Sequence, residues 1–143
     1  LAHPNQPVIA VCGDGGFLFT ATELETAVRI GCRFVLLIWD SPSYDMVEFQ
    51  EQAHYGRVSG IKLGHYDAVK FAESFGCKGY VVTHSETFRE VMQDPLQQIV
   101  PAVIQIPIDY SDNIKLMQSI HQSLITDSSF YHDAADPGLV MKG

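Results

Sequence analysis

Four short apolar runs most constrain what this chain can fold into. Each run is continuous rather than alternating, a pattern typical of strands that are buried on both faces of a sheet. The runs cover residues 7–13, 33–40, 78–84 and 101–109. Segments with helical spacing of apolar residues separate them. Strands that alternate with helices form parallel sheets, so we predict an α/β fold, with a parallel sheet and helices on both faces.

Local signals mark the ends of the intervening helices. After the first run, either Thr20 with Glu23 or Thr22 with Glu25 offers a capping box, and Gly31 is typical of a helix C-terminus. The later helices are expected from about residue 44, between Asp67 and Gly76, from Ser85 to Pro95, and over residues 112–125.

The organisation expected from these signals is one domain followed by a tail. We predict a domain over residues 1–125 and a loose polar tail over residues 126–143. The opening residues LAHPNQP resemble the end of a helix followed by a turn. We therefore expect a partial domain that belongs to a longer chain.

Composition narrows the classes of function. The 143 residues carry a net charge of −8, from 17 acidic and 9 basic side chains. Proteins that bind nucleic acid or anionic lipid present a basic face, so we expect neither partner. No apolar run reaches the length of a membrane span. Three widely spaced cysteines without a CxxC pair (Cys12, Cys32 and Cys77) predict a reducing, cytoplasmic location.

Asp14 lies between glycines at the end of the first predicted strand. In parallel sheets, ligands bind beyond the carboxyl ends of the strands. Glycines allow close approach of the backbone, and the N–H groups that open a helix bind phosphate oxygens. A carboxylate beside a phosphate needs a cation between them, and Mg²⁺ prefers oxygen ligands. We therefore predict a diphosphate site bridged by a metal, with Asp14 as a ligand, near residues 40–43 if the first two strands are adjacent.

Two plainer interpretations stay open at this point. The dipeptide Asp14-Gly15 between apolar runs is also a strong signal for a β-hairpin, although the helical pattern that follows favours a strand, a loop and a helix. Ser41, which precedes Pro42, is also typical of a helix N-cap with proline at the first helical position.

Longer stretches of the chain resemble one family. The thiamine-diphosphate-dependent enzymes carry GDG, some two dozen residues, and then a pair of Asn or Asp residues. Here GDG is at 13–15, residues 16–39 follow, and Asp40-Ser41 takes the place of the pair. The stretches VCGDGGFLFTATELETAVR, LIWDSPSYDMVEFQEQAHYGR, FAESFGCKGY and IPIDYSDN resemble the C-terminal cofactor-binding domain of catabolic, FAD-independent acetolactate synthase. The resemblance covers residues 5–117.

The resemblance implies a set of site residues for thiamine diphosphate and Mg²⁺. Asp14, Ser41 and the backbone carbonyl of Ser43 would bind the metal. Gly15 and Gly16 would bind the diphosphate through the backbone, with Tyr44 beside it. Gln50 would face the substrate pocket.

Ser41 departs from the family pattern, which has Asp or Asn there. A hydroxyl is neutral and short, so it is a weaker ligand for a hard cation. Neighbouring strand residues point to opposite sides, so Asp40 does not simply take its place. Three outcomes are open: Ser41 binds directly or through water, the loop shifts so that Asp40 binds, or the cofactor binds more weakly.

The implied reaction is decarboxylation of pyruvate and addition to a second pyruvate, which yields acetolactate. In the family, an activating glutamate comes from another domain on a partner subunit, so we expect no catalytic residue here, a homodimer or tetramer, and an inactive isolated chain. The alternatives are another thiamine-diphosphate-dependent 2-oxo-acid decarboxylase or lyase, a non-catalytic cofactor-binding subunit of a split enzyme, and a degenerate domain without metal.

Overall fold

A computed structural model describes residues 6–113, 115 and 119 of the chain. Contacts divide the chain into a compact unit, Leu1–Asp109, and a second unit, Tyr110–Gly143. The expected boundary at residue 125, the tail over 126–143 and most of the helix over 112–125 lie outside the described residues. None of the described helices has both the length and the apolarity needed to cross a membrane.

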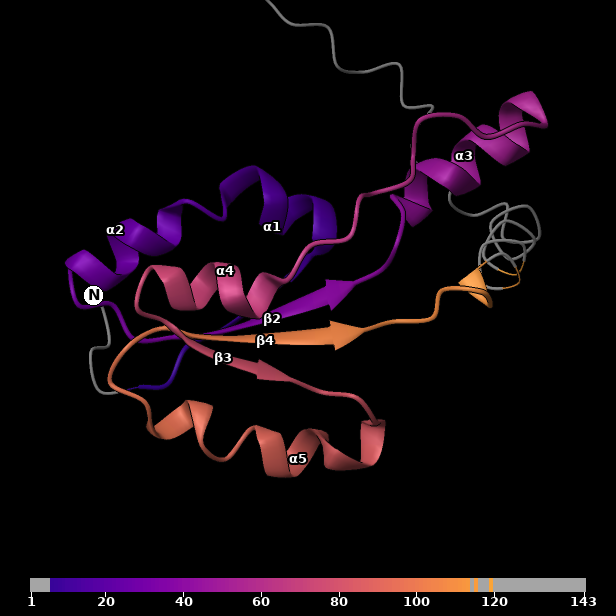
Figure 1. Ribbon diagram of the computed structural model, residues 1–143. Coiled ribbons are helices and arrows are strands. Elements are labelled where there is room, and N and C mark those ends of the chain that lie inside the picture. The colour runs from indigo at the N-terminus through magenta and orange to yellow at the C-terminus, as the bar shows by residue number, and fades with distance from the viewer. Residues whose placement is uncertain (1–5, 114, 116–118, 120–143) are drawn as a thin grey trace, which may run out of the picture. The chain divides into compact units, whose positions relative to one another are not determined.

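Four parallel strands form the sheet of the first unit, in the order β1-β2-β4-β3 (Figure 1). Their bounds are β1 Ile9–Gly13, β2 Val35–Asp40, β3 Lys78–Val81 and β4 Ala102–Pro107. The predicted parallel α/β fold is confirmed. The hairpin interpretation of Asp14-Gly15 is wrong, because a helix over Asp14–Thr20 follows β1 directly and β1 pairs in parallel with β2. The carboxyl ends of β1 and β2 are neighbours, as the predicted site requires.

Five helices and two short 3₁₀ turns are described in this unit. They are α1 Asp14–Thr20, α2 Glu23–Arg29, α3 Asp45–Tyr55, α4 Ala68–Ser74 and α5 Phe88–Val91, with 3₁₀ turns at Ser85–Thr87 and Pro95–Gln97. In Figure 1, α1, α2 and α4 lie on one face of the sheet and α5 lies on the other. Helix α3 extends beyond the tips of the β2 and β4 arrows and has no buried residue.

The two faces of the sheet carry separate cores. On the first face, helix side chains such as Phe17 and Leu24 pack against Ile38 of β2, which is fully buried. On the second face, Ile104 of β4 packs in a cluster to which α5 contributes Phe88. Strands covered on both faces must be apolar throughout, which explains the continuous runs in the sequence.

Some helix ends differ from the sequence-based expectation. Neither capping box forms, because Thr22 is the N-cap of α2 but has helical dihedral angles, whereas a capping side chain requires extended backbone. The helix predicted from Ser85 to Pro95 is broken: α5 covers one turn only, and Pro95 begins a second 3₁₀ turn instead of ending a helix. Asp67 caps α4 as predicted, since its side chain accepts a hydrogen bond from the Lys70 N–H.

Gly31 ends α2 in the predicted way. Its φ of +69° is left-handed, and the N–H groups of Gly31 and Cys32 donate to the carbonyls of Val28 and Ala27. These two bonds make a Schellman motif, which satisfies the last carbonyls of the helix. A side chain at this position is therefore strained even though no atom lies within 4 Å of its Cβ position.

We predict that Gly31→Ala lowers the free energy of unfolding by about 1–2 kcal/mol, the cost of a left-handed non-glycine residue. Gly64→Ala is the matched control, because Gly64 also has open space around its Cβ position but has no positive φ. Urea-induced unfolding followed by circular dichroism measures both variants. Equal stability of the two variants would show that the left-handed geometry carries no cost.

Candidate functional site

The ends of β1 and β2 meet through one carboxylate. Asp14, the first residue of α1, is only 8% exposed, and Ser41, which follows β2, is only 5% exposed. The backbone N–H and the hydroxyl of Ser41 both contact Asp14 Oδ2, at 3.1 and 3.0 Å. Asp14 Oδ1 accepts the N–H of Gly15 at 2.5 Å. The structure therefore brings together the two side chains for which the sequence predicted proximity.

The hydroxyl of Ser41 is surrounded by oxygen acceptors. Its Oγ lies 3.0 Å from Asp14 Oδ2, 2.6 Å from the carbonyl oxygen of Ser43, and within hydrogen-bond distance of Asp45 Oδ2. A hydroxyl has one proton to donate. One proton does not satisfy three acceptors, so the group is rich in lone pairs and short of positive charge.

A second hydroxyl extends this group along α3. Ser43 Oγ lies 3.2 Å from Asp45 Oδ1 and 2.9 Å from Glu48 Oε2, two acceptors for its one proton. We call Asp14, Ser41, Ser43, Asp45 and Glu48 the oxygen cluster. The ion pairs found among the described residues join other side chains, and none includes a carboxylate of the oxygen cluster.

The donor set of the oxygen cluster fits a hard divalent cation. In an octahedral Mg²⁺ site with ligands at 2.0–2.1 Å, neighbouring ligand oxygens are about 2.9 Å apart. The Ser41 Oγ contacts with Ser43 O and Asp14 Oδ2, at 2.6 and 3.0 Å, are close to this spacing. No group of three His, Cys, Asp or Glu side chains forms a metal site within the described part of the chain, so the fit rests on a mixed set of carboxylate, hydroxyl and carbonyl oxygens.

The loop that carries Ser41 and Ser43 is held by the backbone. The N–H of Tyr44 donates to the carbonyl of Ile61, and the N–H of Leu63 donates to the carbonyl of Pro42, both at 3.0 Å. The N-cap of α3 is Tyr44, so the interpretation of Ser41 as an N-cap, with Pro42 as the first helical residue, is wrong.

Tyr44 lies directly against the start of α1. A Cβ atom on Gly15 would lie 2.7 Å from Tyr44 Cε1, closer than such atoms approach. Gly16 differs, because its Cβ position makes ordinary contact, at 3.6 Å, with Cys12. Gly15 is therefore needed for the close packing of Tyr44, whereas Gly16 is not constrained by space.

Asp40 forms hydrogen bonds outside the oxygen cluster. Its carboxylate accepts the Tyr66 hydroxyl at 3.0 Å and the Gln105 amide at 2.6 Å. Burial, reinforced by the hydrogen bond to Asp40, raises the pKa of Tyr66, so this hydroxyl stays protonated and continues to donate. Ser41, rather than its neighbour Asp40, contacts Asp14.

Gln50 is not part of the oxygen cluster. It is exposed on α3, a helix with no buried residue, two residues after Glu48. Asp45 and Glu48 are cluster members that the sequence analysis did not identify. Their spacing of three residues puts both on one face of the first turn of α3, which is the only signal the sequence carries for them.

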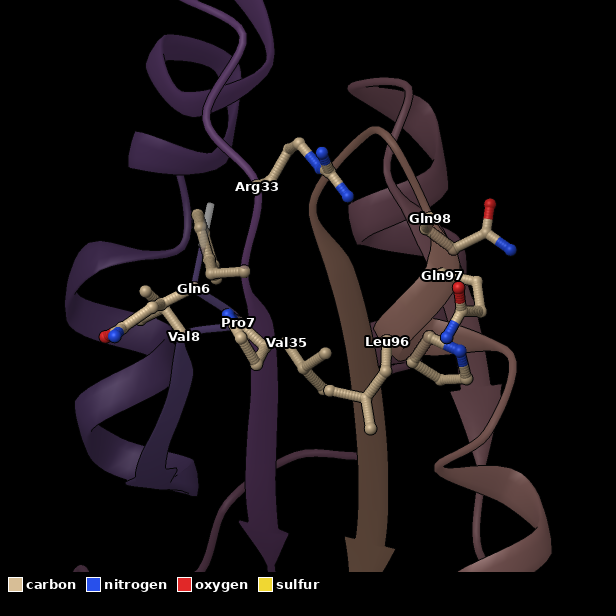
Figure 2. A pocket seen from close by; sticks show the side chains of 10 residues that line it. Gln6, Pro7, Val8, Arg33, Val35, Leu96, Gln97 and Gln98 are labelled. Carbon is tan, nitrogen blue, oxygen red and sulfur yellow. The ribbon is translucent and has the colours of Figure 1, made fainter. Parts of the chain in front are cut away.

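A pocket of about 340 Å³ opens at the opposite end of the sheet, where β1 and β2 begin. Figure 2 shows Arg33 and Val35 on its β2 side, and Leu96, Gln97 and Gln98 across from them. It is remote from the oxygen cluster because the strands run from this end towards Asp14 and Ser41.

The chain matches a described protein family and is similar to curated enzymes. The family described as "Thiamine pyrophosphate enzyme, C-terminal TPP binding domain" matches residues 1–106. An acetolactate synthase of Bacillus subtilis is 45% identical over 116 residues, which are 81% of this chain and 20% of the relative. A catabolic acetolactate synthase of Raoultella terrigena is 42% identical over 125 residues, 87% of this chain and 22% of the relative. The chain thus spans about a fifth of the length of these curated relatives.

Solved structures agree with the family match. The thiamine diphosphate-dependent 4-hydroxybenzoylformate decarboxylase of Rhodococcus jostii RHA1 superimposes with a TM-score of 0.67 at 26% identity, covering 77% of this chain and 21% of that one. The benzoylformate decarboxylase of Polynucleobacter necessarius has the same fold, with a TM-score of 0.69 at 21% identity, covering 75% of this chain and 20% of that one. This chain belongs to the thiamine pyrophosphate enzyme family, and its residues 1–106 match the C-terminal domain that binds the cofactor.

Proposed function

We propose that this chain is the diphosphate- and Mg²⁺-binding domain of a thiamine-diphosphate-dependent acetolactate synthase. The observation that carries the proposal is the contact between Asp14 and Ser41 at the joined ends of β1 and β2. Two further findings support the proposal. The chain matches a cofactor-binding domain, and it is 45% and 42% identical to two acetolactate synthases.

The metal site of this proposal contains Asp14, Ser41 and the backbone carbonyl of Ser43. The hydrogen bonds from the Ser41 hydroxyl to Asp14 Oδ2 and to the Ser43 carbonyl oxygen, at 3.0 and 2.6 Å, support this assignment, because they gather three oxygens of the kind that Mg²⁺ prefers. Asp40, the alternative metal ligand, is less well suited, because its carboxylate accepts hydrogen bonds from Tyr66 and Gln105.

The diphosphate of the cofactor lies, in this proposal, against the start of α1. Gly15 and Gly16 would bind it through backbone N–H groups at the start of the helix, where backbone N–H groups have no carbonyl partner in the preceding turn; the Gly15 N–H, which donates to Asp14 Oδ1, would have to turn to the diphosphate. Tyr44, packed on Gly15, closes this side of the site. Gln50, which is exposed on α3, would face the substrate from outside the oxygen cluster.

Thiamine diphosphate, when bound, supplies the electron sink for decarboxylation of pyruvate and its joining to a second pyruvate. The residues of this chain hold and orient the cofactor, and none of them is assigned proton transfer. The activating glutamate would come from another domain on a partner subunit, so the working enzyme would be a homodimer or tetramer. The three cysteines, Cys12, Cys32 and Cys77, are free thiols, which supports a cytoplasmic location.

A second candidate is a thiamine-diphosphate-dependent 2-oxo-acid decarboxylase. The 26% identity and TM-score of 0.67 with the 4-hydroxybenzoylformate decarboxylase favour this alternative. A cofactor-binding subunit of a split enzyme and a domain that has lost its metal are the remaining alternatives. Incubation of the full protein with pyruvate distinguishes the enzymes: acetolactate as the product supports the first proposal, and acetaldehyde as the main product supports the second.

We predict that Asp14→Asn weakens binding of thiamine diphosphate with Mg²⁺ by at least about 100-fold, because it removes the negative charge that holds the cation. Isothermal titration calorimetry of the full protein measures the loss. Glu90→Gln, which neutralises an exposed acid on α5, is the control and should bind as the wild type does. Unchanged affinity in Asp14→Asn would refute the assignment of the metal site.

We predict that Gly15→Ala lowers the free energy of unfolding by about 1–3 kcal/mol, the usual cost of overpacking, and also weakens cofactor binding by displacing Tyr44. Gly16→Ala is the matched control, since its methyl group makes only an ordinary contact with Cys12. Thermal unfolding and calorimetric titration measure the two effects. If both variants behave alike, the packing of Tyr44 on Gly15 has no role.

We predict that the isolated 143-residue chain, given thiamine diphosphate, Mg²⁺ and pyruvate, forms no acetolactate above background, because it lacks the domain that supplies the activating glutamate. A colorimetric assay for acetoin after acidification measures the product. Sustained turnover by the isolated chain would contradict this prediction and would mean that a complete site forms without another domain.

A further inference from the structure

Ser41 leaves the proposed metal site short of charge. Of the three residues assigned to the cation, only Asp14 brings a negative side chain, since Ser41 offers a neutral hydroxyl and Ser43 offers a carbonyl. A divalent cation is bound more tightly by two carboxylates than by one, and Mg²⁺ sites in proteins use one or two of them. A second carboxylate close to Ser41 would correct this shortage.

Asp45 supplies a carboxylate at that place. The Ser41 hydroxyl lies within hydrogen-bond distance of Asp45 Oδ2 and of Asp14 Oδ2. The same hydroxyl therefore links the two carboxylates. Asp45 Oδ1 accepts the hydroxyl of Ser43 at 3.2 Å, so both serines of the loop bind to Asp45. As the first residue of α3, Asp45 follows directly from the loop that carries the carbonyl ligand.

We propose that Asp45 is the second carboxylate of the divalent-cation site and supplies the charge that Ser41 lacks, an inference that rests on the proposed function. In the absence of a cation, Asp14 and Asp45 are two negative groups joined through one proton donor, which is an unfavourable arrangement. A cation among Asp14 Oδ2, Asp45 Oδ2 and Ser43 O would satisfy all three oxygens.

Glu48 provides a contrast within the same cluster. It lies one turn further along α3, and its carboxylate accepts the hydroxyl of Ser43 at 2.9 Å, whereas the hydrogen bonds of the Ser41 hydroxyl in the described part of the chain go to Asp14, Ser43 and Asp45. Removal of its charge changes the general electrostatics of the cluster as much as removal of the Asp45 charge does. A larger effect at Asp45 than at Glu48 therefore reports proximity to the cation.

The test measures binding of Mn²⁺, in place of Mg²⁺, to the full protein with saturating thiamine diphosphate, with free Mn²⁺ quantified by electron paramagnetic resonance. We expect Asp45→Asn to weaken Mn²⁺ binding roughly tenfold or more, and Glu48→Gln to weaken it less than about threefold. Ser41→Asp should strengthen binding. In the Ser41→Asp background, the effect of Asp45→Asn should shrink, because a carboxylate at position 41 makes the one at position 45 redundant.

The possible outcomes separate this inference from the proposed function. If the wild type does not bind Mn²⁺ with thiamine diphosphate, the proposed function fails and this inference fails with it. If the wild type binds and Asp45→Asn binds equally well, only the role of Asp45 is overturned. Circular dichroism and thermal unfolding verify that each variant folds. If Asp45→Asn does not fold, Asp45→Ser, which keeps a residue favoured at helix starts, takes its place with the same expected loss.

Discussion

The contact between the carboxylate of Asp14 and the N–H and hydroxyl of Ser41 is the interaction on which the site depends. It joins the end of β1 to the end of β2, two segments that are 27 residues apart in sequence. The contact exists only because the two strands are parallel neighbours in register, with Gly13 opposite Trp39. Without β2 beside β1, Asp14 would lose both Ser41 donors and keep only the local N–H of Gly15, and a buried carboxylate with too few donors is costly.

The loop after β2 extends this contact into a site rich in oxygen. Backbone bonds to residues 61–63 hold the loop, so the Ser41 hydroxyl, the Ser43 carbonyl and Asp45 converge beside Asp14. A protein surface that gathers carboxylates in this way loses stability unless a cation joins them. This gathering of oxygen ligands is the feature that supports the proposed binding of a divalent cation and a diphosphate.

The sequence predicted the sheet because continuous apolar runs are what a strand covered on both faces requires. The proximity of Asp14 to Ser41 followed, once parallel strands placed both at one edge. The sequence did not predict that α1 begins at Asp14, since the two glycines that follow, Gly15 and Gly16, are poor helix formers. Burial of Phe17 against the sheet overrides this local preference. Asp45 and Glu48 were also not predicted, because acids in a first helical turn usually interact with the helix dipole, and only the folded loop turns them towards the serines.

The position of the bound metal would decide whether Asp14 holds the cation. Crystals of the full protein grown with thiamine diphosphate and Mn²⁺ would show the cation by its anomalous scattering. We expect one peak at the joined ends of β1 and β2, within about 2.3 Å of Asp14 Oδ2 and of the Ser43 carbonyl oxygen. A peak bound through Asp40, or a diphosphate bound with no metal at Asp14, would contradict this expectation.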